Sequence, residues 1–104
     1  MKFPPNIVKD NNDLKKLAGQ FSLVGDSARL QILCVIFKNN GACVSEITDL
    51  LGSNIAIISH HLQVLSSAGL LVPKRQGKRI CYHLSKETFL TDLKRIICKY
   101  KLIK

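Results

Sequence analysis

Apolar residues recur at three- and four-residue steps through the first half of the chain, a spacing that is typical of helices with one buried face. The first of these helices follows residue 11. The second opens at Asp26 or Ser27, either of which can cap a helix, and ends where two asparagines precede Gly41. Their apolar positions are Leu14, Leu17, Phe21 and Val24 in the first helix, and Leu30, Leu33, Ile36 and Phe37 in the second.

Two helices with almost no chain between them come next. The third helix starts at Cys43, where serine or threonine is the usual cap, and stops at Gly52. Only the residues up to Asn54 separate it from a fourth helix, which makes the pair a candidate helix-turn-helix. Their apolar positions are Val44, Ile47, Leu50 and Leu51 in the third helix, and Ile55, Ile58, Leu62 and Leu65 in the fourth.

The fourth helix has a second face that a core does not need. Successive residues of a helix are turned by about 100°, so small and polar side chains project opposite the apolar stripe. They are Ala56, Ser59, His60 and Gln63, with Ile57 and Val64 at the edge. This face is free to contact another molecule.

The pattern changes after Gly69. In "LLVPKRQGKRICYHLS" two short strand-like runs flank the turn "KRQGKR", which predicts a hairpin with a basic tip. Within it Ile80, Tyr82 and Leu84 alternate with Cys81 and His83. The closing segment is predicted to be a helix capped by Ser85, with Phe89, Leu93, Ile96, Ile97 and Tyr100 on its apolar face. The expected order is four helices, a hairpin and a final helix.

Composition and charge narrow the class of protein. The 104 residues fit one domain, which we expect to cover residues 12–104 after a flexible arm at 1–11. Lysine and arginine give a net charge of +9, which favours a polyanionic partner. We expect a cytoplasmic protein with no membrane partner, because no apolar run approaches the roughly 20 residues that span a bilayer. No enzyme motif is recognisable, so an enzyme is not expected.

The helix pair and the basic hairpin together have the layout of a winged helix-turn-helix. In such a protein the second helix enters the major groove of DNA, while the hairpin, or wing, reaches the flanking phosphates. An RNA-binding or protein-interaction winged helix is the alternative outside duplex DNA. The predicted DNA-binding residues are Asn54, Ala56, Ile57, Ser59, His60, Gln63, Lys74, Arg75, Lys78 and Arg79.

Several stretches resemble one family of regulators. "FSLVGDSARLQILCVIF" is similar to the "LGDPTRLxIL" opening of the ArsR/SmtB family of bacterial repressors, "CVSEITDLLGSNIAIISHHLQVLSSAGLL" resembles its helix-turn-helix, and "GKRICYHLS" its wing. The resemblance implies a mainly α fold with a β-hairpin wing. It also implies a homodimer, joined through the first and last helices, that binds a palindromic operator and releases it when an effector arrives.

Two departures from the family pattern affect DNA recognition. The family commonly has polar residues where this chain has Ile55, Ala56 and Ile57. Because Ala56 and Ile57 offer only apolar contact, base reading would fall mainly on Ser59, His60 and Gln63 and on the shape of the DNA. Ser27 also replaces a usual proline, a change that a helix start tolerates.

The known effector sites of the family can be compared with this chain. The arsenite type has two nearby thiols in the third helix, but in "GACVSEI" Ser45 replaces the second one. The zinc type needs histidine on the last helix, which here offers only Asp92. Elsewhere, adjacent His60 and His61 diverge on their helix, and Cys81 with His83 is half a site at most. We therefore expect no metal and no cofactor.

Two cysteines match another branch of the family. Cys34 in "RLQILC" and Cys98 near the chain end resemble the thiol pair of the sulfide-responsive, HlyU-like and BigR-like regulators, in which reactive sulfur species bridge the two thiols. Cys98 lies among lysines and an arginine, a setting that favours the reactive thiolate. The resemblance implies that Cys34 and Cys98 sense a small reactive sulfur compound or oxidant.

Other roles for the cysteines stay open. Cys34 can be an ordinary core residue, and Cys98 can lie at the edge of a dimer interface. Cys43, at a helix N-terminus that lowers thiol pKa, is the alternative sensing thiol and could join Cys34 or Cys98 in an arsenite or metal site. Cys81 is expected to be incidental. Of the histidines, His61 is expected to be a satisfied packing residue and His83 a solvated one.

Overall fold

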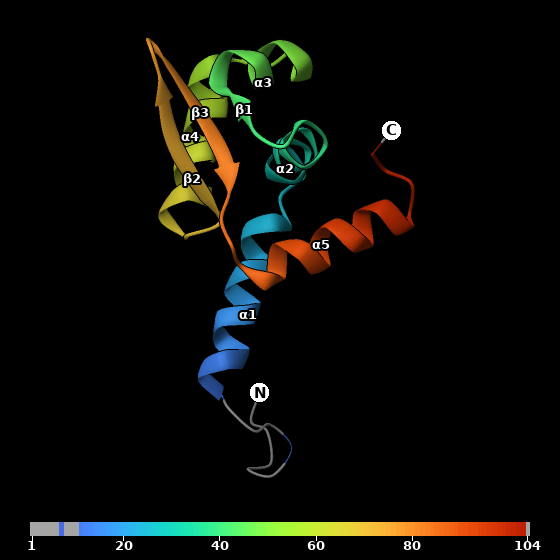
Figure 1. Cartoon of the computed structure of the whole chain (residues 1–104). Helices are drawn as coiled ribbons and strands as arrows, with labels where there is room; N and C mark the ends of the chain where they lie inside the picture. Colours follow the sequence, from blue (N-terminus) through green and yellow to red (C-terminus); the bar gives the residue numbers. More distant parts are fainter. Residues whose placement is uncertain (1–6, 8–10, 104) are drawn as a thin grey trace.

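A small sheet and a helical core make up the molecule (Figure 1). The computed structural model describes residue 7 and residues 11–103. Most of the predicted arm, residues 1–11, lies outside the described residues, and its last residue, Asn11, begins the first helix. The elements are α1 (Asn11–Val24), α2 (Ser27–Asn39), β1 (Ala42–Cys43), α3 (Val44–Leu51), α4 (Ile55–Ser67), β2 (Leu71–Gln76), β3 (Arg79–Leu84) and α5 (Thr88–Lys99).

The predicted helices and the hairpin are confirmed, and the residues at their ends explain where they begin and stop. Asp26 caps α2 by accepting a hydrogen bond from the backbone N–H of Arg29 at 3.0 Å. This bond is the main reason why the pKa of Asp26 is lowered. At the other end of α2, Asn40 adopts a left-handed conformation with φ of 54°. Gly52 ends α3 in the same way, with φ of 62°.

One strand has no counterpart in the sequence prediction. The two residues of β1 pair antiparallel with β3, which gives a three-stranded sheet in the order β1-β3-β2. In this register Ala42 lies opposite Tyr82 and Cys43 opposite Cys81. Since Cys43 also caps α3, the sheet is joined directly to the first helix of the helix-turn-helix.

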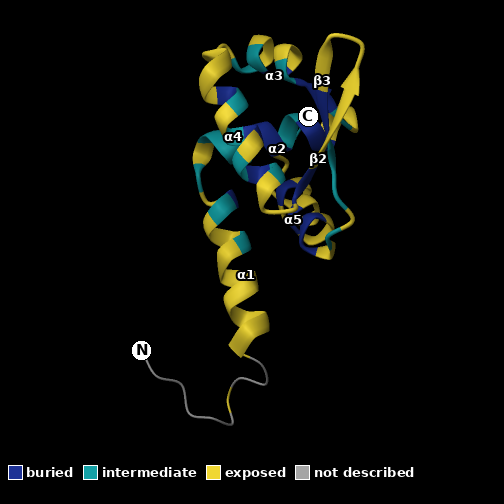
Figure 2. Ribbon diagram, turned by 90° about the vertical axis from the view of Figure 1, so that its left-hand side faces the viewer, coloured by how far each residue is buried: buried dark blue, intermediate teal, exposed yellow. Residues whose placement is uncertain are grey.

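The core lies where α2, α4 and α5 meet the base of the sheet. Figure 2 shows the buried positions gathered there and the exposed positions on α1 and on the hairpin. The predicted apolar stripes are buried in the middle of α2, α4 and α5 and at Ile47 of α3. The predictions that Leu14, Leu17 and Phe21 of α1 and Leu50 of α3 face the core are wrong, because these side chains lie on parts of their helices that extend beyond it and are exposed. The fully buried large side chains include Ile32, Leu33, Ile36, Ile47, Ile58, Leu62, Leu65 and Leu70.

Two sequence predictions at helix starts are wrong. Ile55 was expected in the buried stripe of its helix, but 55% of it is exposed because the first turn of α4 projects beyond the core. Ser85 was expected to cap the last helix, but the N-cap residue of α5 is Glu87. The hydroxyl of Ser85 is buried and has no hydrogen-bond partner within residues 11–103.

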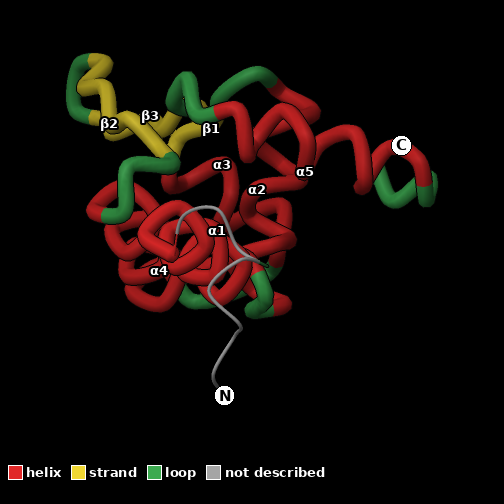
Figure 3. Tube along the Cα trace, turned by 90° about the horizontal axis from the view of Figure 1, so that it is seen from below, coloured by secondary structure: helices red, strands yellow, loops and turns green. Residues whose placement is uncertain are grey.

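The first and last helices extend outward from this core. In Figure 1 and Figure 2, α1 extends away from the body, and Figure 3 shows α5 extending beyond the core on another side. The two helices touch near the body, where the rings of Phe21 and Phe89 meet edge to face with their centres 5.3 Å apart. No single described helix is long and apolar enough to cross a membrane; only α1 and α2 taken together, bent by 90°, reach that length and composition.

Candidate nucleic-acid interface and cysteine pairs

The exposed face of α4 carries most of the predicted base-reading residues. His60 and Gln63 are exposed, and Ser59 is half-buried at the edge of the face. Ala56 and Ile57 are exposed in the first turn, so apolar side chains lead the helix as the sequence indicated. We call α4 the recognition helix from here on.

The side chain of Asn54 has a structural task at the start of the recognition helix. Its Oδ1 accepts a hydrogen bond from the backbone N–H of Ala56 at 2.7 Å, which makes Asn54 the N-cap. The residue was predicted to bind DNA. With its oxygen engaged in the cap, only the side-chain NH₂ group of Asn54 is left to donate to a phosphate or a base.

The wing, made of β2, β3 and their turn, presents its basic side chains to solvent. Lys74, Arg75, Lys78 and Arg79 are all exposed, as the sequence predicted. Gly77 forms the turn with φ of 64°, a conformation that favours glycine. The four cations therefore project from a hairpin whose base is fixed in the sheet.

One of these cations has a partner within the protein. The guanidinium of Arg79 lies 3.1 Å from Oε1 of Glu46 in α3. The same carboxylate oxygen accepts the backbone N–H of Cys43 at 3.1 Å. Glu46 thus joins the wing to the start of the helix-turn-helix. Sequence analysis missed this residue, although a glutamate three positions after a cap is a recognisable signal.

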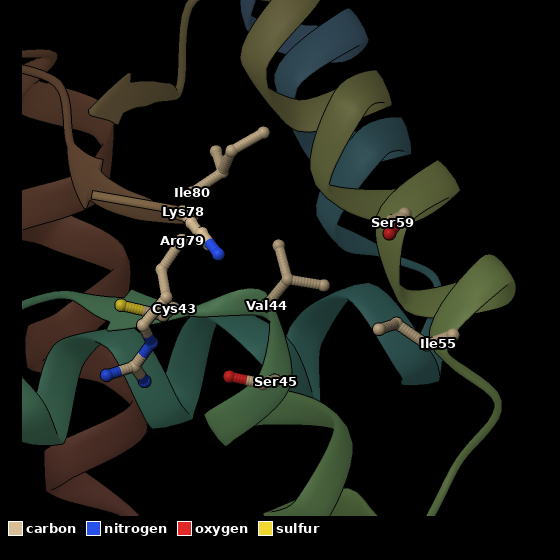
Figure 4. A pocket seen from close by; sticks show the side chains of 8 residues that line it. All are labelled: Cys43, Val44, Ser45, Ile55, Ser59, Lys78, Arg79 and Ile80. Atoms are coloured by element: carbon tan, nitrogen blue, oxygen red, sulfur yellow. The ribbon is translucent and has the colours of Figure 1, made fainter. Parts of the chain in front are cut away.

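A hollow of about 300 Å³ separates the wing from the recognition helix. Figure 4 shows Lys78, Arg79 and Ile80 of the wing on one side of this hollow, and Ile55 and Ser59 of the recognition helix on the other. The exposure of Ile55 follows from this position. The recognition helix and the wing, the two elements predicted to bind DNA, therefore both border this hollow.

The histidines differ from their sequence interpretation, except for exposed His60. His83 was expected to be solvated, but it is half-buried and its Nε2 has no partner among the described residues. Its ring lies against Gly41, where a Cβ would come within 2.5 Å of Nδ1. His61 was expected to be satisfied, yet its buried Nδ1 also has no partner among the described residues. No three of the described His, Cys, Asp and Glu side chains gather as metal ligands.

Cys34 and Cys98, the switch pair, lie on helices that pack together. Cys34 on α2 is half-buried and packs against the core, while Cys98 on α5 is exposed. Burial raises the pKa of the Cys34 thiol, and the charge of Cys98 raises it further. Both thiols are free in this structure.

The other two cysteines are bonded to each other. A disulfide links Cys43 of β1 to Cys81 of β3, which stand opposite each other in the sheet. We call them the root pair, because they lie at the base of the wing. The expectation that Cys81 is incidental is therefore wrong, and the partner of Cys43 here is neither Cys34 nor Cys98. A sequence separation of 38 and an unpredicted strand hid this pairing.

Comparison with known proteins places these features in one family. The profile of the family described as "Bacterial regulatory protein, arsR family" matches residues 26–72. An uncharacterized HTH-type transcriptional regulator of Methanocaldococcus jannaschii is 36% identical over 70 residues, which cover 67% of this chain and 79% of that protein. The cadmium resistance transcriptional regulatory protein CadC of Listeria innocua is 28% identical over 71% of this chain, which spans only 62% of that relative.

Solved structures share the fold. Reduced HlyU from Vibrio cholerae superimposes with a TM-score of 0.79 at 23% identity, over 86% of this chain and 93% of that one. The homodimeric winged helix-turn-helix DNA-binding domain Mb0332 from Mycobacterium bovis gives 0.72 at 26% identity, over 98% and 94%. The curated relatives named above are transcriptional regulators, so the expectation that the chain is not an enzyme is confirmed. The chain belongs to the arsR family of bacterial regulatory proteins, with a winged helix-turn-helix fold.

Proposed function

We propose that this protein is a homodimeric repressor that binds a palindromic operator and releases it when the switch pair, Cys34 and Cys98, becomes covalently linked. The observation that carries the proposal is that the two free thiols lie on α2 and α5, two helices that pack together, and the charge of Cys98 also raises the pKa of Cys34. A reagent that bridges these sulfur atoms would fix one helix against the other. The resemblance of "RLQILC" to the sulfide-responsive branch and the structural likeness to HlyU support the same reading.

The surroundings of Cys34 allow a small molecule to approach. A cavity of about 590 Å³ lies beside it, lined mainly by apolar residues of α2 together with Leu51 and Leu102. Cys98 is open to solvent. A reagent can therefore meet Cys98 first and Cys34 second.

The chemistry is a pair of displacements at sulfur. The Cys98 thiolate attacks the central sulfur of an organic trisulfide, R–S–S–S–R, and one RS⁻ leaves. Cys34, as thiolate, then attacks the same sulfur and displaces the second RS⁻. The products are a trisulfide bridge between the two cysteines and two thiols RSH, so the trisulfide is reduced as the protein is oxidised.

Linking the switch pair is expected to alter the dimer. The two recognition helices of a winged helix-turn-helix dimer must lie about one DNA turn, roughly 34 Å, apart to enter successive major grooves. Because α5 and α1 extend beyond the core as the expected dimer helices, a shift of α5 against α2 changes that spacing. Affinity for the operator then falls.

The test begins by selecting duplexes from a random pool with the reduced protein, since the operator is unidentified. Binding to a selected duplex is then measured before and after treatment with glutathione trisulfide. Wild type should release the DNA, whereas Cys34→Ser and Cys98→Ser should bind and stay bound. The control is the double variant Cys43→Ala with Cys81→Ala, which removes the other two thiols, leaves the switch pair intact and should release normally. Release that persists in both serine variants would overturn the switch.

Peptide mapping provides a second readout, because trypsin places each cysteine on its own peptide. Cys34 and Cys98 fall on residues 30–38 and 96–99, and a linked pair of these peptides carrying one additional sulfur is expected. If both stay unmodified, arsenite and Cd²⁺ should be tested on fully reduced protein. Release by either ion that requires Cys43 would favour a metal-responsive repressor instead.

A further inference from the structure

The root of the wing is tied to the helix-turn-helix at one point. Cys43 is at once a residue of β1, the N-cap of α3 and the disulfide partner of Cys81 on β3. We infer that Cys43 and Cys81 form a second, reversible redox site, whose disulfide clamps the wing to the helix-turn-helix and thereby strengthens DNA binding. This inference rests on the DNA-binding fold and not on the switch pair.

Position in the sheet explains why this pair can close. The two residues face each other in an antiparallel register, an arrangement that holds their side chains on the same side of adjacent strands. Only two residues make up β1, so backbone hydrogen bonds alone fix little of its pairing with β3. A covalent bond at this point therefore strengthens a short strand pairing.

The polar contacts around the pair serve the same junction. The carboxylate of Glu46 accepts both the backbone N–H of Cys43 and the guanidinium of Arg79, which precedes Cys81 by two residues. However, Arg79 and Glu46 are both about half exposed, and such surface ion pairs contribute roughly 0–1 kcal/mol. The disulfide is thus the stronger of the two links between α3 and the wing.

The reduced form of the root pair, with two free thiols, is also compatible with this structure. The sulfur of Cys81 lies 3.6 Å from Oε1 of Gln76. A disulfide sulfur has no proton to donate, so only the free thiol can use this acceptor. Reduction therefore leaves Cys81 with a weak hydrogen-bond partner in its buried surroundings, and both redox states are compatible with the fold.

Because the root pair is buried, it is expected to react at a different rate from the switch pair. Cys43 and Cys81 are 5% and 2% exposed, whereas Cys98 is exposed. Thiol–disulfide exchange needs access to the attacked sulfur. The root pair should therefore react far more slowly than Cys98 and respond to lasting changes in thiol redox balance.

The balanced reaction uses a low-molecular-weight disulfide, R–S–S–R, as oxidant. The thiolate of one root cysteine attacks a sulfur of R–S–S–R and releases RS⁻, which leaves a mixed disulfide. The thiolate of the other root cysteine displaces the second RS⁻ and closes the protein disulfide. Two thiols of the protein are oxidised, and the small disulfide is reduced to two thiols.

The experiment uses the full chain with Cys34→Ser and Cys98→Ser, so that only the root pair can react. This variant is equilibrated in buffers of oxidised and reduced glutathione and digested without reduction. A link is expected between peptides 39–74 and 80–86, which carry Cys43 and Cys81. If these peptides remain unlinked at every ratio, the inference is overturned.

Closed and open forms of that same variant are then compared, which avoids any effect of replacing the buried cysteines. The bond closes a loop with a sequence separation of 38, so the closed form should melt at least about 5 °C higher. It should also protect backbone amides of the wing from hydrogen exchange and bind a random-sequence duplex about threefold more tightly. Equal binding and equal amide protection in the two forms would overturn the clamp, whatever becomes of the switch pair.

Discussion

At the scale of single residues, the two free cysteines differ in reactivity for a physical reason. Burial raises the pKa of Cys34, and the charge of Cys98 adds to it. Since the thiolate is the nucleophile, the fraction of reactive Cys34 rises at higher pH than for a cysteine in an unfolded peptide. Cys98, being exposed, is the thiol that a reagent meets first.

The predicted result is a displaced pH profile for alkylation of Cys34. Mass spectrometry of peptide 30–38 after brief treatment with iodoacetamide should show half-maximal rate at a pH above that of the denatured protein. In Cys98→Ser the profile should move part of the way toward that of the denatured protein, because the burial of Cys34 remains while the charge of Cys98 is removed. A Cys34 profile below that of the denatured chain would contradict this assignment.

Residues also show what sequence could and could not predict. The helical stripes placed Leu33, Ile58 and Leu62 in the core correctly, because a spacing of three and four follows directly from helix geometry. Ile55 fits the same stripe and is exposed, since periodicity does not say where a helix leaves the core. Cys81 was misjudged because pairing between strands is set by tertiary register.

At the scale of elements, the four wing cations are not equivalent. Lys74, Arg75 and Lys78 have no ion-pair partner among the described residues, whereas Arg79 is held by Glu46. Binding of Arg79 to a phosphate requires this ion pair to exchange. The sequence showed a uniform basic hairpin, and only the packing of β3 beside α3 distinguishes its members.

This difference predicts unequal effects of two neighbouring substitutions. Lys78→Ala should weaken binding to duplexes of any sequence and lower the slope of log K against log salt by about one per protomer. Arg79→Ala should lower the slope by less, because part of its charge is already compensated by Glu46. The measurement is a salt titration of binding to one duplex.

Neutralising Glu46, the ion-pair partner of Arg79, gives the matched control. Glu46→Gln releases Arg79 and should raise the affinity for DNA severalfold and steepen the salt slope. Identical slopes for Lys78→Ala and Arg79→Ala, with no gain in Glu46→Gln, would show that the ion pair does not affect DNA binding.

Among the elements, the helices and the hairpin could be predicted from the sequence, and the short strand β1 could not. All five helices and the hairpin were predictable, because each has a long periodic or alternating pattern and recognisable ends. Two-residue β1 was not, since a strand of that length has no pattern of its own and exists only through β3. Without β1, the sequence could not predict that Cys43 and Cys81 face each other.

At the scale of the whole molecule, apolar side chains are left uncovered on the two outermost helices. These are Leu14, Leu17 and Phe21 on α1, and Ile96 on α5 with Tyr100 at its C-cap, all exposed in the single chain. Exposed large apolar side chains gathered on two helices indicate a protein interface. Its position supports the homodimer proposed above, with α1 and α5 as the contact.

Ile96→Asp should therefore produce a monomer. A charge buried in an apolar interface without a partner costs several kcal/mol, enough to dissociate a modest dimer. The control is Ile57→Asp, which alters an equally exposed apolar residue on the recognition helix: Ile96 and Ile57 are 49% and 52% exposed. Sedimentation should show a monomer for Ile96→Asp and a dimer for Ile57→Asp. Two dimers would place the interface elsewhere.

The same variant should lose most of its affinity for a two-site operator. A dimer binds its second half-site at a high effective concentration, and a monomer forfeits that advantage. Binding of the isolated half-site should change little, because the recognition helix and the wing are intact. The dimer thus raises affinity without any additional contact to DNA.

The disulfide between Cys43 and Cys81 has a consequence for the descent of this protein. A cysteine at only one of the two positions has no bond to make, so selection for the link acts on both codons together. Among relatives the two positions should gain and lose cysteine as a unit, and independently of positions 34 and 98. The root pair of the wing and the switch pair of the helices would then have evolved independently of each other.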